Sequence, residues 1–150
     1  MIHPLSDVQS EQIGDGTHVW QFTVVLHGAV IGRDCSIGAN CSVENDVKIG
    51  EGVTIKNGVQ VWDRIVIGDG VFVDPNATFS NDLNPSSRRG AANKEPELQP
   101  TAIGEGASIG AGSVVIKDVP EFSLVYGSPT RVHGRVDEKG NIVERRKSGM

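Results

Sequence analysis

Aliphatic residues return at every sixth position over most of this chain of 150 residues. One unbroken series runs from Ile13 to Phe79, and the same phase resumes from Ile103 to Val115. An α-helix needs an apolar period of 3.6 residues and an amphipathic strand a period of two, so neither explains a period of six. The first series is Ile13, Val19, Val25, Ile31, Ile37, Val43, Ile49, Ile55, Val61, Ile67, Val73 and Phe79.

Each six-residue unit combines a short apolar segment with a bend. A small or β-branched residue lies two positions before the apolar one, and three positions after it there is usually Gly, Asn or Asp, which tolerate positive φ. Three units close a coil of 18 residues, and successive coils stack at the spacing of β-strands, about 4.8 Å. The pattern therefore predicts an all-β fold, a parallel β-helix of hexapeptide repeats with about five coils, four before an interruption and one after it.

The interruption, residues 80–101, is rich in Asn, Pro, Ser and Gly and predicts a loop. Phe79 closes one coil and Ile103 opens the next, so the loop is extruded without disturbing the phase. Loops of about 20 residues on a rigid scaffold are usually functional, and Arg88, Arg89 and Lys94 add positive charge here. The alternative is a loop that is merely solvated.

Beyond Val115 the repeat ends, because Pro120 removes a backbone donor from the ladder. Residues 125–132 are expected to cap the open end, residues 136–143 to form a hairpin, and residues 144–150 to fray. We therefore divide the chain into a β-helix domain, 1–136, and a hairpin with a frayed tail, 137–150.

Charge and composition exclude several classes of partner. The net charge of −5 predicts no general attraction to nucleic acid or to an anionic membrane. There is no apolar run of about 18 residues and no signal-like start, so we expect no membrane span and a cytoplasmic location. Cys35 and Cys41 are expected to be reduced, buried thiols rather than a disulfide or metal pair. Four histidines without clustering predict no metal site.

Residues 18 apart should stack on the outer surface, and one such row holds four polar residues beside the start of the loop: His27, Asn45, Asp63 and Asn81. Trp62 lies in the neighbouring row. His27 beside Asp63 and Asn45 could serve as a general base, or could equally be an exposed polar residue or part of a subunit contact. The row itself could be only a solvated polar ladder.

The units I-G-R-D-C-S, I-G-A-N-C-S, I-G-E-G-V-T and I-G-D-G-V-F resemble those of the hexapeptide-repeat acyltransferases. That resemblance implies a left-handed helix. The segment Gly70–Pro85, with F-S-N-D-L-N-P, is similar to the segment before the loop in bacterial nucleotide-sugar 3-N-acetyltransferases. His18–Phe22, Val114–Pro120 and Gly127–Val132 resemble the same group, so the similarity covers nearly the whole chain.

The resemblance implies an acetyl-CoA-dependent enzyme that acetylates UDP- or dTDP-linked 3-amino sugars for surface polysaccharides, with CoA thiolate taking the proton. It implies a homotrimer with sites between subunits and no metal. Asn81 would hydrogen-bond the sugar's amino group, and His27 is kept as a second catalytic candidate. The expected substrate contacts are Asp82, Asn84, Asp63, Trp62 and Asn45. The expected CoA contacts are the backbone of Gly110, Ala111 and Gly112 and the side chains of Lys117 and Arg131.

One departure from the family concerns the coils after the loop, where relatives usually have two and this sequence shows one. Two rival hypotheses therefore stay open beside the N-acetyltransferase. One is an O-acetyltransferase of the same fold acting on a hydroxyl, which needs a general base more urgently. The other is a non-catalytic scaffold or binding module. A γ-type carbonic anhydrase is a more distant rival, because the histidine ligands are missing.

Overall fold

The computed structural model describes residues 1–87 and 97–147, and all its regular elements there are β-strands. No helix in these residues is long and apolar enough to span a membrane. The strands are β1 (Asp7–Val8), β2 (His18–Val19), β3 (Val24–Val25), β4 (Val30–Ile31), β5 (Ser36–Ile37), β6 (Ser42–Val43), β7 (Lys48–Ile49), β8 (Thr54–Ile55), β9 (Gln60–Val61), β10 (Ile65–Ile67), β11 (Phe72–Val73), β12 (Thr78–Phe79), β13 (Thr101–Ile103), β14 (Ser108–Ile109), β15 (Val114–Val115), β16 (Ser123–Tyr126), β17 (Arg131–Val136) and β18 (Ile142–Arg145).

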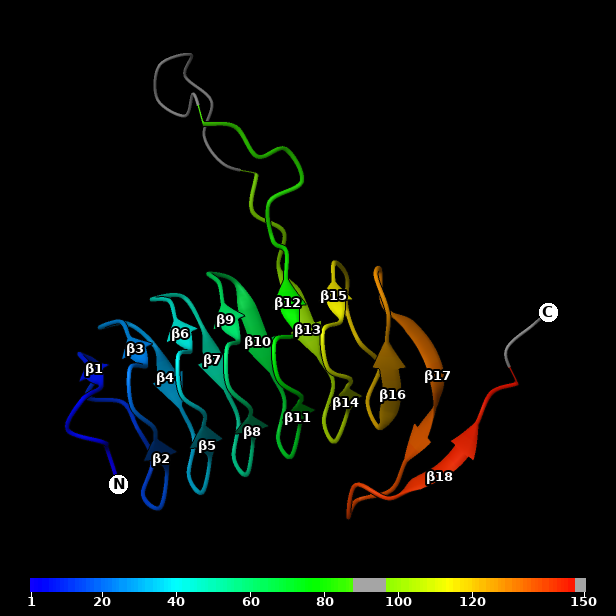
Figure 1. Cartoon of the computed structure of the whole chain (residues 1–150), viewed down its shortest axis with the longest axis horizontal. Coiled ribbons are helices and arrows are strands. Elements are labelled where there is room, and N and C mark those ends of the chain that lie inside the picture. Colours follow the sequence, from blue (N-terminus) through cyan, green and yellow to red (C-terminus); the bar gives the residue numbers. More distant parts are fainter. Residues whose placement is uncertain (88–96, 148–150) are drawn as a thin grey trace.

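The strands form three parallel sheets that wrap one helix, as Figure 1 shows along its length. Sheet A contains β2-β5-β8-β11-β14-β16, sheet B contains β1-β3-β6-β9-β12-β15, and sheet C contains β4-β7-β10-β13. Partners before the loop are 18 residues apart, for example Val25 with Val43 and Ile37 with Ile55. The predicted period is therefore the register of the sheets.

The apolar residue of each unit points into the core. Ile37, Val43, Ile55 and Val61 are at most 1 % exposed, and the small residues two positions earlier fill the inner corners. Cys35 and Cys41 are among these small residues, and both are buried free thiols, as predicted. The core is thus a stack of aliphatic layers closed by small corner residues.

Sheet B has six strands, one per turn, so the helix makes about six turns rather than the five counted from the sequence. An extra part-turn precedes Ile13, where Ile2 pairs with Val19. Another follows β15, where Val119 pairs with Ile103 and β16 pairs with β14. The expectation of a single coil after the loop was therefore too low. Val119 follows Ile103 by 16 residues instead of 18, and this shift of two hides the turn from a search with a fixed period.

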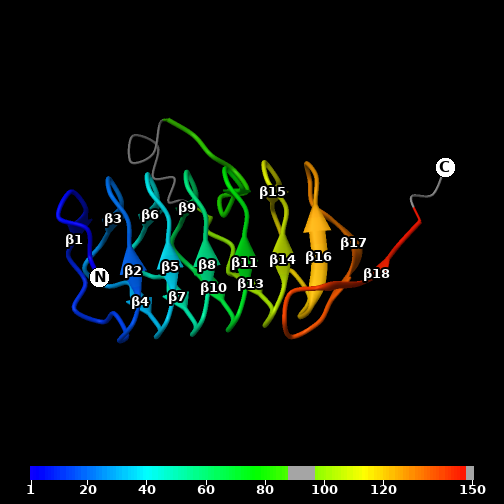
Figure 2. The same cartoon turned by 60° about the horizontal axis from the view of Figure 1, so that its bottom comes forward.

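The C-terminal end is covered by an antiparallel extension of sheet A, seen at the right of Figure 2. β16 pairs with β17, and β17 pairs with β18. The turn between β17 and β18 is held by Asp137, whose Oδ1 accepts hydrogen bonds from the N–H groups of Lys139 (2.9 Å) and Asn141 (2.8 Å). The predicted hairpin is present, and its first strand begins at Arg131, earlier than expected.

Candidate functional site

The loop leaves the helix between sheets B and C, directly after β12 (Figure 1). Its two legs are joined at the base, where the N–H of Gln99 donates to the carbonyl of Asn81 (2.7 Å) and Asp82 bridges to Leu98. We call this base the loop neck. Arg64 reinforces it, because its Nη1 donates to the carbonyl of Leu98 (3.0 Å). The predicted cations Arg88, Arg89 and Lys94 lie outside the described residues.

The backbone of Arg64 has φ 69°, a left-handed conformation that normally favours Gly or Asn. This residue stands where other units carry Gly or Asp, so the sequence pattern read it as an exception. Its side chain spans to the returning leg of the loop, a role that needs a long donor. The only signal in the sequence was a charged residue at a bend position immediately before the coil that bears the loop.

The row of His27, Asn45, Asp63 and Asn81 stacks as predicted, and hydrogen bonds link its members to neighbouring coils. Oδ1 of Asn45 accepts from the N–H of Gly28 (3.0 Å), and Oδ1 of Asp63 accepts from the N–H of Asp46 (2.8 Å). The N–H of Asp63 donates to Oε2 of Glu44 (2.7 Å). Asn45 and Asp63 therefore satisfy backbone donors at this corner of the helix.

Asn81 occupies the end of this row and the start of the loop neck. Its Nδ2 donates to the carbonyl of Asp63 (2.9 Å), and its own carbonyl accepts from Gln99. The bond to Asp63 orients the half-buried amide and leaves Oδ1 without a partner among the described residues. Asn81 thus presents a fixed hydrogen-bond acceptor at the base of the loop.

His27 is exposed and makes no hydrogen bond to the described residues. It lies three coils from Asn81 in the same chain, about 14 Å at the usual strand spacing. A general base must approach the proton that it takes to hydrogen-bonding distance, directly or through one water. In one chain His27 therefore cannot act on an amine held by Asn81.

The other predicted substrate contacts surround the loop neck. The half-buried Trp62 packs against the core, and its Nε1 donates to the carbonyl of Phe79 (2.8 Å), immediately before the loop. Oδ1 of Asp82 accepts from the N–H of Asn84 (3.0 Å), a local turn that starts the outgoing leg. Trp62 and Asp82 therefore shape the neck, while the side chain of Asn84 is exposed.

Lys117 and Arg131 are brought together by the cap. They line one groove of about 280 Å³ together with Thr130 and Val132. Lys117 and Asp118 also border a second hollow of about 350 Å³, lined by Leu83, Gln99 and Ile116 at the foot of the loop. The two hollows meet at Lys117 and form a path from the loop neck to the cap. Sequence analysis missed Gln99 and Ile116, because neither belongs to a motif.

Gly110, Ala111 and Gly112 lie at the corner between sheets A and B, on the first turn after the loop. Gly112 has φ 65° and open space where a Cβ would stand, and Ala111 is exposed. The loop neck lies at the opposite edge of sheet B. Within one chain the structure therefore does not bring this backbone together with Asn81.

The described residues contain no group of three His, Cys, Asp or Glu side chains that could hold a metal ion. Burial raises the pKa of the Cys35 and Cys41 thiols, which makes them poor nucleophiles at neutral pH. The chemistry available at the loop neck is therefore hydrogen bonding and orientation rather than metal or thiolate catalysis by these groups.

Residues 12–45 and 46–81 match the family of bacterial transferase hexapeptide repeats (six repeats). Such repeats indicate the left-handed form of the helix. The chain is 40 % identical over 151 residues to the dTDP-3-amino-3,6-dideoxy-α-D-galactopyranose 3-N-acetyltransferase of Aneurinibacillus thermoaerophilus. That alignment covers 90 % of this chain and 78 % of the relative.

Two solved structures share the fold. WeeI from Acinetobacter baumannii AYE superposes with a TM-score of 0.72 at 27 % identity, over 86 % of this chain and 55 % of WeeI. The acetyltransferase domain of PglB from Neisseria gonorrhoeae FA1090, in complex with acetyl coenzyme A, gives 0.71 at 25 % identity, over 87 % of this chain and 56 % of that one. The chain thus spans just over half the length of these two structures.

Proposed function

Because the chain belongs to the hexapeptide-repeat acyltransferase family, we propose that it transfers an acetyl group from acetyl-CoA to the amino group of a nucleotide-linked 3-amino sugar. The identity of 40 % to a dTDP-3-amino-sugar 3-N-acetyltransferase, across nine-tenths of the chain, carries this proposal. PglB, which has the same fold, was solved with acetyl coenzyme A, and this supports the donor.

Asn81 supplies the acceptor geometry that the reaction needs. Its Oδ1, oriented through the Nδ2 bond to Asp63, accepts an N–H of the sugar's neutral amine and directs the nitrogen lone pair at the thioester carbonyl. The C–N bond forms, the C–S bond breaks, and the departing CoA thiolate takes the proton lost by nitrogen. No protein base is required, which agrees with the distance between His27 and Asn81.

The hollows that meet at Lys117 support a position for CoA. The thioester would lie at the loop neck, and the phosphates would lie in the groove of Lys117 and Arg131. Both side chains are exposed cations that can donate charge-assisted hydrogen bonds to phosphate oxygens. The turn formed by Val119 and β16 provides part of the wall that the sequence seemed to lack, which removes the motive for a non-catalytic scaffold.

The opposite positions of Asn81 and Gly110–Gly112 favour a site between copies of the chain. A pantetheine arm can contact both only where the loop edge of one copy faces the Gly110 edge of the next. We therefore propose a homotrimer, since repeating this contact around a threefold axis closes the assembly. We place the reaction in the cytoplasm, as a step in building surface polysaccharide such as O-antigen.

The test is release of free CoA thiol from acetyl-CoA against UDP- and dTDP-linked 3-amino and 4-amino sugars. We expect turnover with a 3-amino sugar and an N-acetylated product by mass spectrometry. Absence of thiol release with every sugar of the panel would refute the proposal. Turnover with a hydroxyl acceptor alone would favour an O-acetyltransferase.

A further inference from the structure

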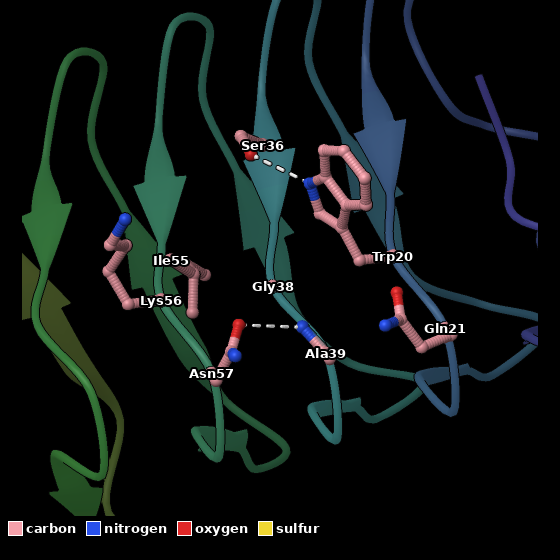
Figure 3. A pocket seen from close by; sticks show the side chains of 8 residues that line it. All are labelled: Trp20, Gln21, Ser36, Gly38, Ala39, Ile55, Lys56 and Asn57. Atoms are coloured by element: carbon pink, nitrogen blue, oxygen red, sulfur yellow. Dashed lines mark hydrogen bonds between the residues drawn. The ribbon is translucent and has the colours of Figure 1, made fainter.

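The corner between sheets A and B carries a groove that is separate from the loop neck and from the groove of Lys117. It has a volume of about 340 Å³ and spans the coils of β2, β5 and β8. We call it the Trp20 groove. The side chains of Trp20, Gln21, Lys56 and Asn57 surround a bare stretch of backbone at Gly38 and Ala39 (Figure 3).

The groove exists because of one stacked row on this corner: Trp20, Gly38 and Lys56. Gly38 contributes no side chain, so a notch opens between the indole and the lysine (Figure 3). A Cβ at Gly38 would lie 2.5 Å from Oδ1 and 2.7 Å from the backbone nitrogen of Asn57. The next coil approaches so closely that only glycine fits here.

The aromatic wall of the groove is held in place and still accessible. Trp20 is 39 % exposed, its Nε1 donates to Oγ of Ser36 (3.3 Å), and its ring meets His18 edge to face at 6.3 Å between centroids. An indole that is oriented before a ligand arrives loses little freedom on binding. Its exposed face is therefore a preformed stacking surface.

The polar groups of the groove are available to a ligand. Oδ1 of Asn57 accepts from the N–H of Ala39 (2.9 Å), which leaves its Nδ2 as a donor. The side chains of Gln21 and Lys56 make no hydrogen bond or ion pair with the described residues, and no acidic side chain lines the groove. The site thus offers an aromatic face, two amides and one cation.

On the basis of the proposed function, we propose that the Trp20 groove binds the nucleoside diphosphate of the acceptor sugar whose amino group is held by Asn81 of an adjoining copy. A pyrimidine base would stack on Trp20, and its carbonyl and N–H groups match the amides of Gln21 and Asn57. The ammonium of Lys56 would bind the diphosphate. A neutral sugar alone would leave this cation unused.

The order of features along the helix axis supports this assignment. The groove occupies the coils of β2, β5 and β8, Asn81 follows β12 on the next coil, and Gly110–Gly112 follow β14 on the coil after that. Nucleotide, amino sugar and acetyl donor would therefore lie in sequence along one line. The groove and Asn81 lie at opposite edges of sheet B, so one ligand contacts both where two copies pack together.

Binding can be tested without catalysis. The chain has two tryptophans, so a ¹H–¹⁵N spectrum should show two indole signals, and Trp20→Phe assigns them. On titration with dTDP and with UDP we expect the Trp20 indole and the amides of Gln21 and Asn57 to shift, while the Trp62 indole stays still. Unmoved Trp20 signals with both nucleotides, including the case where a neighbouring copy covers the groove, would overturn the proposal even if acetyl transfer is found.

Kinetics of variants give a second readout. Trp20→Ala and Lys56→Gln should each raise the KM for the nucleotide sugar and the Kd for dTDP or UDP about tenfold. The kcat and the KM for acetyl-CoA should stay within about twofold, because neither side chain approaches the thioester. Phe72→Ala and Lys48→Gln are matched controls, an exposed aromatic and an exposed lysine outside the groove. Unchanged nucleotide-sugar KM in both groove variants would contradict the assignment.

Mixed assemblies test the placement between copies. Co-expressed Trp20→Ala and Asn81→Ala chains form sites that pair an intact groove from one chain with an intact Asn81 from the other. We expect activity with the low, wild-type KM to appear in the mixture, although neither variant shows it alone. Its absence from an assembly shown to be mixed by mass spectrometry would place groove and Asn81 of a site in one chain and overturn the proposal.

Discussion

The two edges of sheet B are built from the same six-residue units, yet their bends are closed in different ways. At the edge shared with sheet A, the bend N–H donates to a backbone carbonyl of the preceding coil, as from Asn40 to Gln21 (3.2 Å) and from Gly58 to Ala39 (3.0 Å). At the edge shared with sheet C, the N–H groups of Gly28 and Asp46 donate to side chains of Asn45 and Asp63 instead.

This difference shows which polar side chains are available for function. Where backbone satisfies backbone, as around the Trp20 groove, exposed side chains remain free to bind ligands. Where side chains satisfy the bends, as in the row above the loop, most of that row serves the fold. Asn81 is the exception, because its amide is anchored through Nδ2 and its Oδ1 remains available.

The largest effect that we expect tests this exception. Asn81→Ala should lower kcat by about 10²–10³ while leaving the circular dichroism spectrum unchanged, since the variant removes an orienting contact to the reacting nitrogen. Steady-state thiol release with the best amino sugar measures it. Thr78→Ala, an exposed change on β12, should behave as wild type. A loss of less than about tenfold in Asn81→Ala would place the acceptor amine elsewhere.

The second prediction compares the two edges in stability. Asp63→Ala should lower the free energy of unfolding by about 1–3 kcal/mol, because the N–H of Asp46 loses its acceptor. Gln21→Ala, at the other edge, should change it by less than about 0.5 kcal/mol. Urea unfolding of both variants measures the difference. Equal costs would mean that the two edges are not closed by different means.

The third prediction concerns the cap end of the loop edge. Lys117→Gln and Arg131→Gln should each raise the KM for acetyl-CoA several-fold, up to about tenfold, and salt should reduce the effect. The KM for the nucleotide sugar should not change. Lys139→Gln, in the exposed hairpin turn, serves as the control. If salt has no influence on the KM for acetyl-CoA, these cations do not bind its phosphates.

The smallest effect is a dependence of stability on alkaline pH. Burial raises the pKa of the Cys35 and Cys41 thiols in the folded chain, so folding favours their protonated form. This stability is fully present below the pKa of an unfolded thiol, about 8.5, and is lost as the pH rises through the higher folded values. Urea unfolding from neutral pH to about pH 10 should show the loss. The variant with both Cys35→Ala and Cys41→Ala should show a flatter profile, and an unchanged slope would attribute the loss to other groups.

Much of the fold could be predicted because one number, the period of six, repeats without a polar exception from Ile13 to Phe79. The period predicted the strands, the inward layers, the loop and the row that ends at Asn81. It failed at the two ends. Residues before Ile13 carry no repeat, and the shift of two residues before Val119 removed the last turn from the count.

The candidate site was less predictable than the fold. Stacking placed Asn81 beside Asp63, but the sequence could not say that Asn45 and Asp63 are occupied by bends of the neighbouring coil. Nor could it show that Lys117 and Arg131 share a groove, since they are joined only by the reversal of the chain between β16 and β17. The Trp20 groove escaped notice because its notch comes from a missing side chain at Gly38.

The sequence alone determined the architecture, because an aliphatic residue at every sixth position can be buried only if the chain bends after each short strand and stacks every 18 residues. Only the tertiary structure decided which polar groups remain free. Each backbone N–H at a corner must find an acceptor, and whether that acceptor is a carbonyl or a side chain depends on the local path of the backbone. The six-residue period is thus a property of the sequence, whereas the availability of Asn81 and the Trp20 groove is a property of hydrogen bonds between coils.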